Sequence, residues 1–446
     1  MSTDRQENML LAALYDRPLP ARRLREFLGD ISPATLSRLT RQLGGRIVSF
    51  GQARSTTYAR PRDVRGLGFK FPVFRIDQDG NANHAGEIWS LHGGYRWQGT
   101  GEWLPELYSY LPWFIQDMRP EGFVGRAFAH RFSLDLGLPD RLFDWKDDDV
   151  LVGLSRRGED AMGDLIVGEE SVMRYLKNIR LVTPVDVSRY PDLASAALAG
   201  DPAGSSAGGE QPKFSALVQG DGSFRQVLVK FSPLLSTPQG QRWSDLLVCE
   251  HLALGVLERF GVPAVSSAIH QMADRTFLEV ERFDRVGMRG RTPAVSLTAV
   301  DAEFAGTGSN WTTAADALFD ARRITGADAR DMSRLDFFGG LIANTDRHFG
   351  NISLIPTDEG RTRFRLAPAY DMLPMYYRPR EGEELNWEVY NIVSAGTWPD
   401  MHEAAKAFWQ EASVDTRISK PFRATCRANL EQLALFDSAP RVIRGR

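Results

Sequence analysis

The sequence has very little cysteine and no long apolar segment. Cys249 and Cys426 are the two cysteines among 446 residues, and neither belongs to a CxxC pair. This argues against a disulfide framework and a cysteine-based zinc site. No apolar run approaches the roughly 18–20 residues that a membrane-spanning helix needs, and no apolar secretory core follows the polar N-terminus. These absences predict a cytoplasmic protein without a membrane partner.

Lysine is missing from the first 65 residues, although arginine is abundant there. This segment has twelve arginines against six acidic residues, a net charge of +6, whereas the whole chain carries −3. The rest of the chain, with 381 residues, is therefore acidic at −9. A basic segment on an acidic body suggests contact with nucleic acid at one end. The hydrophobic content of 43% is ordinary for a globular protein.

Three short helical patterns and two strand patterns fit the N-terminal segment. The first two helices are expected around residues 9–14 and 20–29. The third begins at Ser32-Pro33, because serine is a good N-cap and proline suits the first helical position. Two short strands follow at 46–50 and 55–60. The apolar residues that the second and third helices should bury are Leu24, Phe27, Leu28, Leu36, Leu39 and Leu43.

This order of two helices, a capped polar helix and a basic hairpin is typical of a winged helix-turn-helix. The third helix would enter the major groove of double-stranded DNA, and the wing would contact the backbone. The alternative is a small helical protein-interaction module whose arginines are solvated. The residues expected to contact DNA are Ser37, Arg38 and Arg41 on the third helix and Arg54 in the wing.

The next part of the chain favours short antiparallel strands. Residues 67–100 alternate apolar and polar positions between Gly and Asn turns, and 149–154 with 163–167 predict another hairpin. The three aspartates at 147–149 fit a solvated turn better than a cation site. The aromatic residues between Trp89 and Trp113 are expected to form core, with a partner surface as the alternative.

A segment rich in Gly and Ser, residues 204–213, precedes two further strand patterns. Small residues let backbone N–H groups approach phosphate oxygens, but the Walker A spacing is absent. By itself, the pattern is also that of a flexible loop. The residues expected to contact a bound nucleotide here are Ser206, Gly208, Gly209 and Lys213.

Lys230 ends an apolar strand pattern, and Glu250 follows twenty residues later in a predicted helix at 246–260. Protein kinases need a lysine that contacts the α- and β-phosphates and a glutamate that holds this lysine in place. The spacing predicts such a pair. The alternative is a lysine that ends a strand and a solvated glutamate on a helix.

Asp346 and Asn351 lie in a polar turn after an apolar helix pattern, with the Asp-x-x-x-x-Asn spacing of a kinase catalytic loop. The aspartate would orient a hydroxyl, and the asparagine would reach a metal ion on the phosphates. Asp371 follows two strand patterns, where a kinase places its second magnesium ligand, and oxygen donors of this kind suit Mg²⁺. The alternative is a metal-dependent nuclease or hydrolase that uses Asp346, His348 and Asp371.

Five motifs, in this order, resemble the HipA family of serine/threonine kinase toxins over roughly residues 65–440. The winged N-terminus resembles that of its longer, YjjJ-like subgroup. The motifs are the loop from Ser206 to Lys213, Leu228-Val229-Lys230-Phe231, Val280-Glu281-Arg282-Phe283-Asp284-Arg285, the Thr345-Asp346-x-His348-x-x-Asn351 turn, and Tyr370-Asp371.

The resemblance implies an α+β protein with a bilobed HipA/protein-kinase-like fold that uses ATP and Mg²⁺. The domains would be a winged helix-turn-helix at 1–65, a kinase N-terminal lobe with the Gly-rich loop at 66–285, and a mostly helical C-terminal lobe at 286–446. The implied roles are nucleotide binding by Lys230, Glu250, Glu281 and Phe283, catalysis by Asp346 with His348 beside it, and metal binding by Asn351 and Asp371.

The resemblance also implies a function and a form of self-inhibition. In the family a serine of the Gly-rich loop is autophosphorylated, and here Ser206 matches best, with Ser205 as the competitor. The expected activity is phosphorylation of a protein on Ser or Thr, with an aminoacyl-tRNA synthetase as one implied substrate class and an antitoxin as an implied partner. A second hypothesis is a DNA-binding transcription regulator whose kinase-like body only senses nucleotide.

Overall fold

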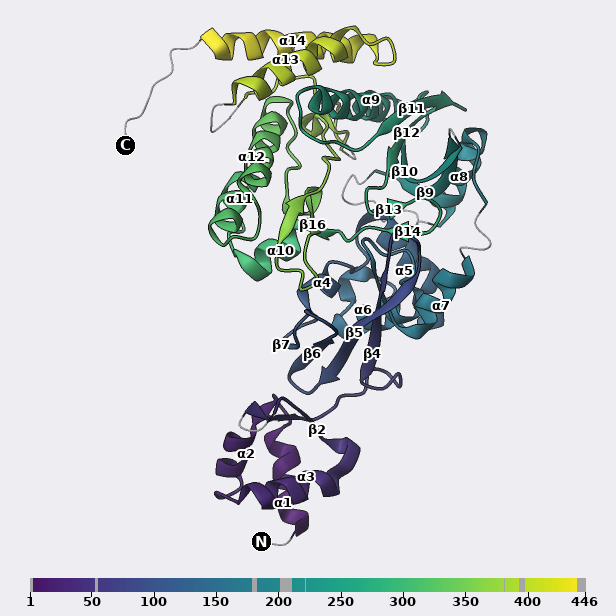
Figure 1. Cartoon of the computed structure of the whole chain (residues 1–446). Coiled ribbons are helices and arrows are strands. Elements are labelled where there is room, and N and C mark those ends of the chain that lie inside the picture. The colour runs from purple at the N-terminus through teal and green to yellow at the C-terminus, as the bar shows by residue number, and fades with distance from the viewer. Residues whose placement is uncertain are drawn as a thin grey trace.

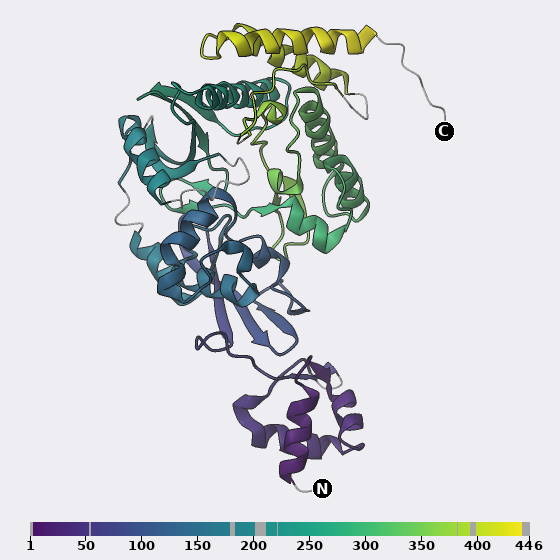
Figure 2. The same ribbon diagram turned by 180° about the vertical axis from the view of Figure 1, so that it is seen from behind.

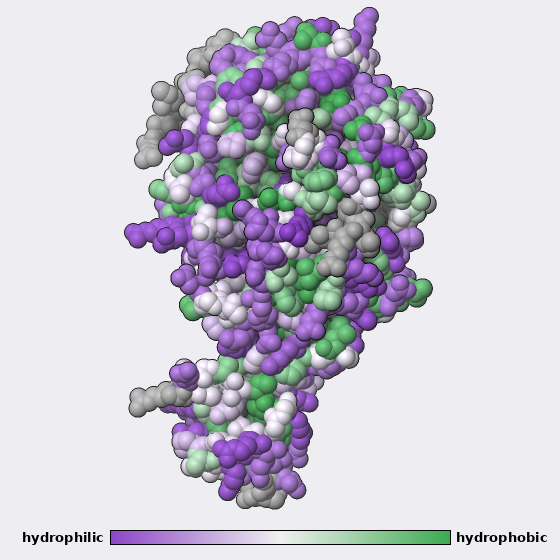
Figure 3. Space-filling view, turned by 45° about the vertical axis from the view of Figure 1, so that its right-hand side comes forward, coloured by the Kyte–Doolittle hydropathy of each residue, from purple (hydrophilic) through white to green (hydrophobic). Residues whose placement is uncertain are grey.

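The computed structural model describes residues 3–52, 55–178, 183–200, 211–220, 222–380, 382–392 and 398–438. A small N-terminal module lies at one end, a region built on a five-stranded sheet follows, and a larger body of sheet and helices lies at the other end (Figures 1 and 2). The space-filling view shows the module joined to the body by a narrower neck (Figure 3). Among the described residues no helix is both long and apolar enough to cross a membrane.

The N-terminal module has three helices and a small sheet around its own core. The Oγ atom of Ser32 accepts a hydrogen bond from the Thr35 N–H at 3.1 Å, so the predicted N-cap is present. The sheet has the order β1-β3-β2. The elements are α1 (Thr3–Ala13), β1 (Leu19–Pro20), α2 (Ala21–Phe27), α3 (Pro33–Leu43), β2 (Val48–Phe50) and β3 (Thr57–Ala59).

One predicted core residue of this module lies at the surface. Leu24 and Leu28 of the second helical pattern are buried, but Phe27 is 54% exposed. The helix is only seven residues long. Phe27 is its last residue and lies three positions after Leu24, yet its side chain faces solvent, so helical spacing alone does not decide burial here. The expectation that Phe27 is buried was therefore wrong.

The middle region is built on an antiparallel sheet with the order β7-β6-β5-β4-β8. Trp97, Trp103 and Trp113 are all less than 10% exposed, as the prediction that this aromatic segment forms core requires, but Tyr110 in the same segment is 72% exposed. The strands are β4 (Lys70–Ile76), β5 (Ala82–Leu91), β6 (Gly94–Gly99), β7 (Glu106–Tyr108) and β8 (Leu165–Val167). The helices are α4 (Trp113–Gln116), α5 (Gly122–Leu136), α6 (Asp147–Arg157) and α7 (Glu169–Asn178).

The first arm of the predicted hairpin is a helix. Residues 149–154 lie inside α6, and only the second arm forms a strand, β8, which pairs with β4. Three aspartates in the first turn of α6 and two arginines in its last turn complement the helix dipole. The aspartates at 147–149 are thus not a solvated turn. They pair with Arg119, Arg62 and Arg65. In the described part of the chain, no group of three or more His, Cys, Asp or Glu residues is arranged to hold a metal ion.

A second antiparallel sheet, of order β11-β12-β10-β9, begins the larger body. Helix α8 covers one face of this sheet through an apolar cluster, and helix α9 packs on β12, β11 and β10. The elements are α8 (Tyr190–Ala199), β9 (Lys213–Gly220), β10 (Ser223–Phe231), α9 (Pro238–Arg259), β11 (Ser267–Met272), β12 (Arg275–Glu281), β13 (Arg285–Val286) and β14 (Gly290–Arg291).

The rest of the body is mainly helical around a three-stranded sheet of order β15-β16-β17. One apolar core runs from the middle region through this part of the chain. The predicted boundaries at residues 65 and 285 stay predictions. The elements are β15 (Val295–Ser296), α10 (Leu297–Phe304), α11 (Trp311–Asp320), α12 (Gly326–Leu341), β16 (Ser353–Pro356), β17 (Phe364–Leu366), α13 (Pro399–Val414) and α14 (Lys420–Ser438).

Candidate active site

Lys230 lies on the face of β10 opposite the apolar side chains. Val229 and Phe231 belong to the cluster that packs against α8. Because side chains alternate along a strand, Lys230 is directed to the other face, towards α9. Its Nζ atom donates hydrogen bonds to Oε1 and Oε2 of Glu250 at 2.6 and 2.9 Å. The structure therefore brings together the two residues predicted to form a kinase Lys–Glu pair.

Asp371, which is partly exposed, completes this charge cluster. Its Oδ1 atom accepts a hydrogen bond from the same Lys230 Nζ atom. Lys230 is 4% exposed and Glu250 is fully buried. Buried charges need such partners, because leaving one unpaired in the interior is costly. Lys230 thus joins strand β10, helix α9 and the segment after β17.

The charges of the cluster follow from burial and its partners. Burial alone would lower the pKa of Lys230, but Asp371 and Glu250 outweigh it and raise that pKa above its usual value. Burial would raise the pKa of Asp371, but Lys230 and Lys213 hold it below its usual value. Burial dominates for Glu250, so its pKa is raised in spite of Lys230. Lys230 and Asp371 are therefore charged at neutral pH.

The predicted catalytic turn follows α12 directly. Asn351 donates from Nδ2 to the backbone oxygen of Asp346 at 2.9 Å and to its Oδ2 atom at 3.3 Å. The Nε2 atom of His348 lies 3.9 Å from Oδ2 of Asp346, and both side chains are accessible, with 59% and 37% exposed. An accessible aspartate oriented by an asparagine five positions on can receive a substrate hydroxyl.

Asn344 joins the two halves of the site, and sequence reasoning missed it. This residue is 1% exposed. Its Oδ1 atom accepts from the Asp346 N–H at 3.0 Å, and its Nδ2 atom donates to the backbone oxygen of Asp371 at 3.3 Å. Asn344 precedes Thr345-Asp346 in the motif, so a polar residue at the end of an apolar helix was the available signal.

A second missed group supports the same turn from behind. The Nε atom of Arg347 donates to Oδ1 of Asp336 on α12 at 3.1 Å, and its Nη1 atom donates to the backbone oxygen of Asn344. The other oxygen of Asp336 accepts from the N–H of Thr312 at 3.2 Å. These contacts fix the turn to two helices of the body.

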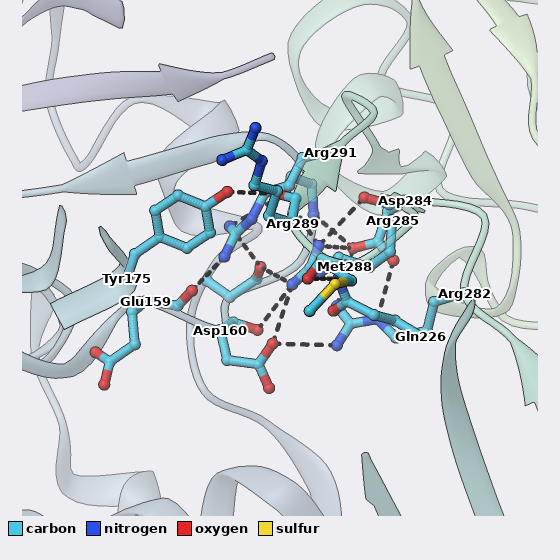
Figure 4. A network of polar contacts seen from close by, with 12 residues as sticks. Glu159, Asp160, Tyr175, Gln226, Arg282, Asp284, Arg285, Met288, Arg289 and Arg291 are labelled. Atoms are coloured by element: carbon cyan, nitrogen blue, oxygen red, sulfur yellow. Dashed lines mark hydrogen bonds and ion pairs between the residues drawn. The ribbon is translucent and has the colours of Figure 1, made fainter. Parts of the chain in front are cut away.

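The Glu281–Arg285 motif divides between two places. Phe283 stacks on Tyr370, next to Asp371, with ring centroids 5.8 Å apart and planes inclined by 22°. Glu281 ends β12, and its Oε2 atom lies 3.6 Å from Nη1 of Arg225. The other three residues of the motif, Arg282, Asp284 and Arg285, join a polar network with the middle region (Figure 4). The motif thus contributes one aromatic ring next to the charge cluster and a set of ion pairs outside it.

The remaining predicted site residues lie elsewhere in the chain or outside its described part. Lys213 begins β9, in register opposite Lys230. Ser37, Arg38 and Arg41 are exposed on α3, far along the chain from this site. The predicted residues that fall outside the described part of the chain are Arg54, Ser205, Ser206, Gly208 and Gly209.

The oxygen donors that could hold a metal are Asn351 and Asp371. Asp371 is ionised, and Asn351 supplies a neutral amide oxygen. Hard oxygen donors in small number suit Mg²⁺, which keeps other positions for water and phosphate. The pairing of Asp371 with Lys230 places a cation that could contact phosphate oxygens beside a candidate metal ligand, so the residues present fit a magnesium–nucleotide complex.

Sequence comparisons identify two regions of the chain. Residues 67–176 match the model of the YjjJ-like toxin, middle domain. Residues 205–432, about half of the chain, match the HipA-like C-terminal domain. Toxin YjjJ of Escherichia coli strain K12 is 37% identical over 436 residues, which cover 95% of this chain and 97% of that protein.

Two solved structures are similar at lower levels. One is the HipA toxin–antitoxin system of Shewanella oneidensis MR-1 with HipB and operator DNA, with a TM-score of 0.48, 15% identity, and coverage of 82% of this chain and 96% of that one. The other is the Helicobacter pylori proinflammatory kinase CtkA, with a TM-score of 0.33, 12% identity, and coverage of 50% and 87%. Membership rests on the sequence matches, which confirm the resemblance drawn from the motifs: the chain belongs to the family of YjjJ-like toxins, which have a HipA-like C-terminal domain.

Proposed function

We propose that this protein is an ATP-dependent serine/threonine protein kinase. The observation that carries the proposal is the pairing of the buried Lys230 with both Glu250 and Asp371, next to a turn that holds Asp346 and Asn351. Lys230 and Glu250 make the contact with one another that a kinase Lys–Glu pair uses. Asn344 connects the turn to Asp371, so the phosphate-binding and hydroxyl-binding sides of the site form one unit.

In the proposed reaction, Lys230 contacts the phosphates of ATP while Glu250 holds its ammonium group in place. Mg²⁺, held by Asn351 and Asp371, would neutralise charge on the phosphate oxygens. Asp346 orients the Ser or Thr hydroxyl of a protein substrate and accepts its proton. The hydroxyl oxygen forms a bond to the γ-phosphorus, the bond to the β,γ-bridging oxygen breaks, and ADP leaves. Phe283, which stacks on Tyr370, and Glu281 at the end of β12 are proposed to contact the adenine.

The substrate and partners are proposals that follow from family membership. An aminoacyl-tRNA synthetase is the protein class that the HipA resemblance implies, and an antitoxin is the implied partner. A metal-dependent nuclease that uses Asp346, His348 and Asp371 is less well supported. In such an enzyme, neither Lys230 nor Glu250, which pair with one another in the interior, would have a part in the reaction.

Self-inhibition by phosphorylation is part of the proposal. Incubation with Mg-ATP is expected to add one phosphate to Ser206. This phosphate would inhibit the enzyme, because it would place about two negative charges where the ATP phosphates bind. Ser206→Ala should abolish this modification, whereas Ser205→Ala should retain it. Peptide mapping by mass spectrometry checks the result. Loss of the phosphate in Ser205→Ala alone would assign it to the neighbouring serine.

We also propose that the N-terminal module binds double-stranded DNA. The supporting observation is α3, which buries Leu36, Leu39 and Leu43 in the module core and exposes its polar face. In this proposal the module is a winged helix-turn-helix, with α3 in the major groove and Arg54 in the wing.

Removal of two exposed arginines should weaken DNA binding in a salt-dependent manner. The variant Arg38→Ala with Arg41→Ala is expected to lower affinity and to reduce the slope of log K against log salt by about two, because each arginine neutralises about one phosphate. Fluorescence anisotropy with a labelled duplex at several salt concentrations measures both quantities. Arg22→Ala with Arg23→Ala, on exposed positions of α2, is the matched control. An equal slope in wild type and in the α3 variant would contradict the proposal.

A further inference from the structure

The loop before β8, residues 159–164 of the middle region, contacts two segments that lead to the proposed kinase site. On one side it meets the Arg282–Arg285 motif, as Figure 4 shows. The Gly163 N–H donates to Oδ2 of Asp284 at 2.9 Å, and the Gly163 oxygen accepts from Arg285 at 3.2 Å. Burial would raise the pKa of Asp284, but the two neighbouring arginines hold it below its usual value. This part of the contact is therefore charged and buried.

The other side of the same loop holds a buried ion pair with the metal-ligand hairpin. Both carboxylate oxygens of Asp164 accept from Nη2 of Arg361, at 2.6 and 2.7 Å. The side chains are 2% and 5% exposed. The guanidinium of Arg361 also lies over the ring of Trp103, 4.9 Å from its centroid, so the arginine inserts into the middle region.

Arg361 lies in the turn between β16 and β17, whose far ends lead to the proposed metal ligands. Asn351 comes two residues before β16, and Asp371 comes five residues after β17. The strands pair through Leu354 and Leu366. A shift of this turn would therefore move the two ligands, because the paired strands transmit it.

The turn does not need Asp164 in order to form. Asp358 already accepts hydrogen bonds from the N–H groups of Thr362 and Arg363, at 2.9 and 2.8 Å. The contact with Asp164 instead ties the turn to the middle region. The backbone oxygen of Asp164 accepts from the Ile76 N–H at 2.8 Å, so the carboxylate is itself fixed to the middle sheet. Asp160, with 66% of its side chain exposed, is a weaker anchor in the same loop.

We infer that Asp164 is a positioning residue for the proposed metal ligands Asn351 and Asp371, which it sets through its buried ion pair with Arg361. The middle region then helps to position the proposed kinase site and does not only connect the N-terminal module to the body. This inference rests on the proposed kinase function, because it assigns Asn351 and Asp371 to a metal–nucleotide complex.

The test uses the full chain and the variant Asp164→Asn, which keeps the shape of the side chain and removes its charge. The Mg²⁺ concentration for half-maximal binding of a non-hydrolysable ATP analogue is expected to rise by about tenfold or more, because groups that orient metal ligands typically affect affinity by 10–100-fold. Turnover at saturating Mg²⁺ should change much less. Asp164→Glu, which keeps the charge, should recover part of the Mg²⁺ affinity.

The control variant is Asp147→Asn, which breaks another ion pair of the middle region, with Arg119. It should lower the unfolding temperature without changing the Mg²⁺ dependence, so a merely structural effect is separated from a positioning effect. Equal Mg²⁺ dependence in wild type and Asp164→Asn would overturn the inference.

A wild-type protein that shows no Mg²⁺-dependent nucleotide binding would contradict the proposed function. Hydrogen exchange of residues 353–371 then decides the positioning role by itself. Faster exchange there in Asp164→Asn, and not in Asp147→Asn, would support the role. Unchanged exchange would overturn it.

Discussion

Replacing Asp346 with asparagine is expected to lower the rate of phosphoryl transfer by about 10²–10⁴-fold, the usual contribution of a positioned acid or base. The asparagine keeps the size of the side chain but cannot accept the hydroxyl proton. Nucleotide affinity should stay within about twofold, because Lys230 and Asp371 are intact. The unfolding temperature should not fall, since 37% of the Asp346 side chain is exposed and it carries no buried ion pair. Single-turnover kinetics with labelled ATP measures the rate.

Asp331→Asn is the matched control for this substitution. Asp331 lies on α12, and its carboxylate pairs with Arg334 away from the catalytic turn. The Asp331→Asn variant should transfer phosphate at the wild-type rate. Wild-type transfer by Asp346→Asn would show that another residue handles the hydroxyl. Loss of nucleotide binding in that variant would show that Asp346 has a structural role.

Replacing Lys230 with methionine should abolish transfer and destabilise the protein at the same time. The substitution leaves Glu250 fully buried without its cation, and breaking a buried pair in this way typically costs about 3–5 kcal/mol. The pKa of Glu250, already raised by burial, should rise further. Thermal unfolding at several pH values is the measurement. Because a protonated Glu250 is tolerated better, the loss of stability should be smaller at low pH.

A double variant separates the two effects. Lys230→Met with Glu250→Gln removes both charges, so much of the lost stability should return while transfer stays abolished. The two substitutions are therefore expected to be strongly non-additive in stability. Additive losses would mean that Lys230 and Glu250 do not depend on one another in the folded protein. Recovery of transfer in the double variant would exclude the proposed role of Lys230.

Sequence patterns were sufficient where a residue and its partner belong to regular, well-spaced elements. An apolar strand that ends at Lys230 and a helix that carries Glu250 predict their pairing, because a strand followed by a helix that packs on its sheet brings such residues together. Asp346 and Asn351 interact within one short turn, so their spacing alone indicates the contact. The three helices of the N-terminal module were predicted from caps and apolar spacing, although Phe27 shows that a short helix can bury fewer residues than its pattern suggests.

Other features depend on partners that no local pattern reveals. The apolar run at 149–154 fits a strand or a buried helix equally well, and seven consecutive buried residues in α6 remove the periodicity that would decide between them. Asp164 and Arg361 are 197 positions apart in the chain. Arg282, Asp284 and Arg285 belong to the motif in which Glu281 and Phe283 are expected to bind nucleotide, but they contact a loop that precedes them by more than a hundred residues.

The most direct test of the proposed kinase is the intact mass of dephosphorylated full-length protein after incubation with Mg-ATP. The wild type is expected to gain one phosphate, and Asp371→Asn is expected to gain none, because it loses a proposed metal ligand and one of the two partners of Lys230. Binding of ATP by the wild type is measured in parallel. A wild type that binds ATP but gains no phosphate, on itself or on an added protein substrate, would contradict the account and favour a nucleotide-sensing DNA-binding regulator.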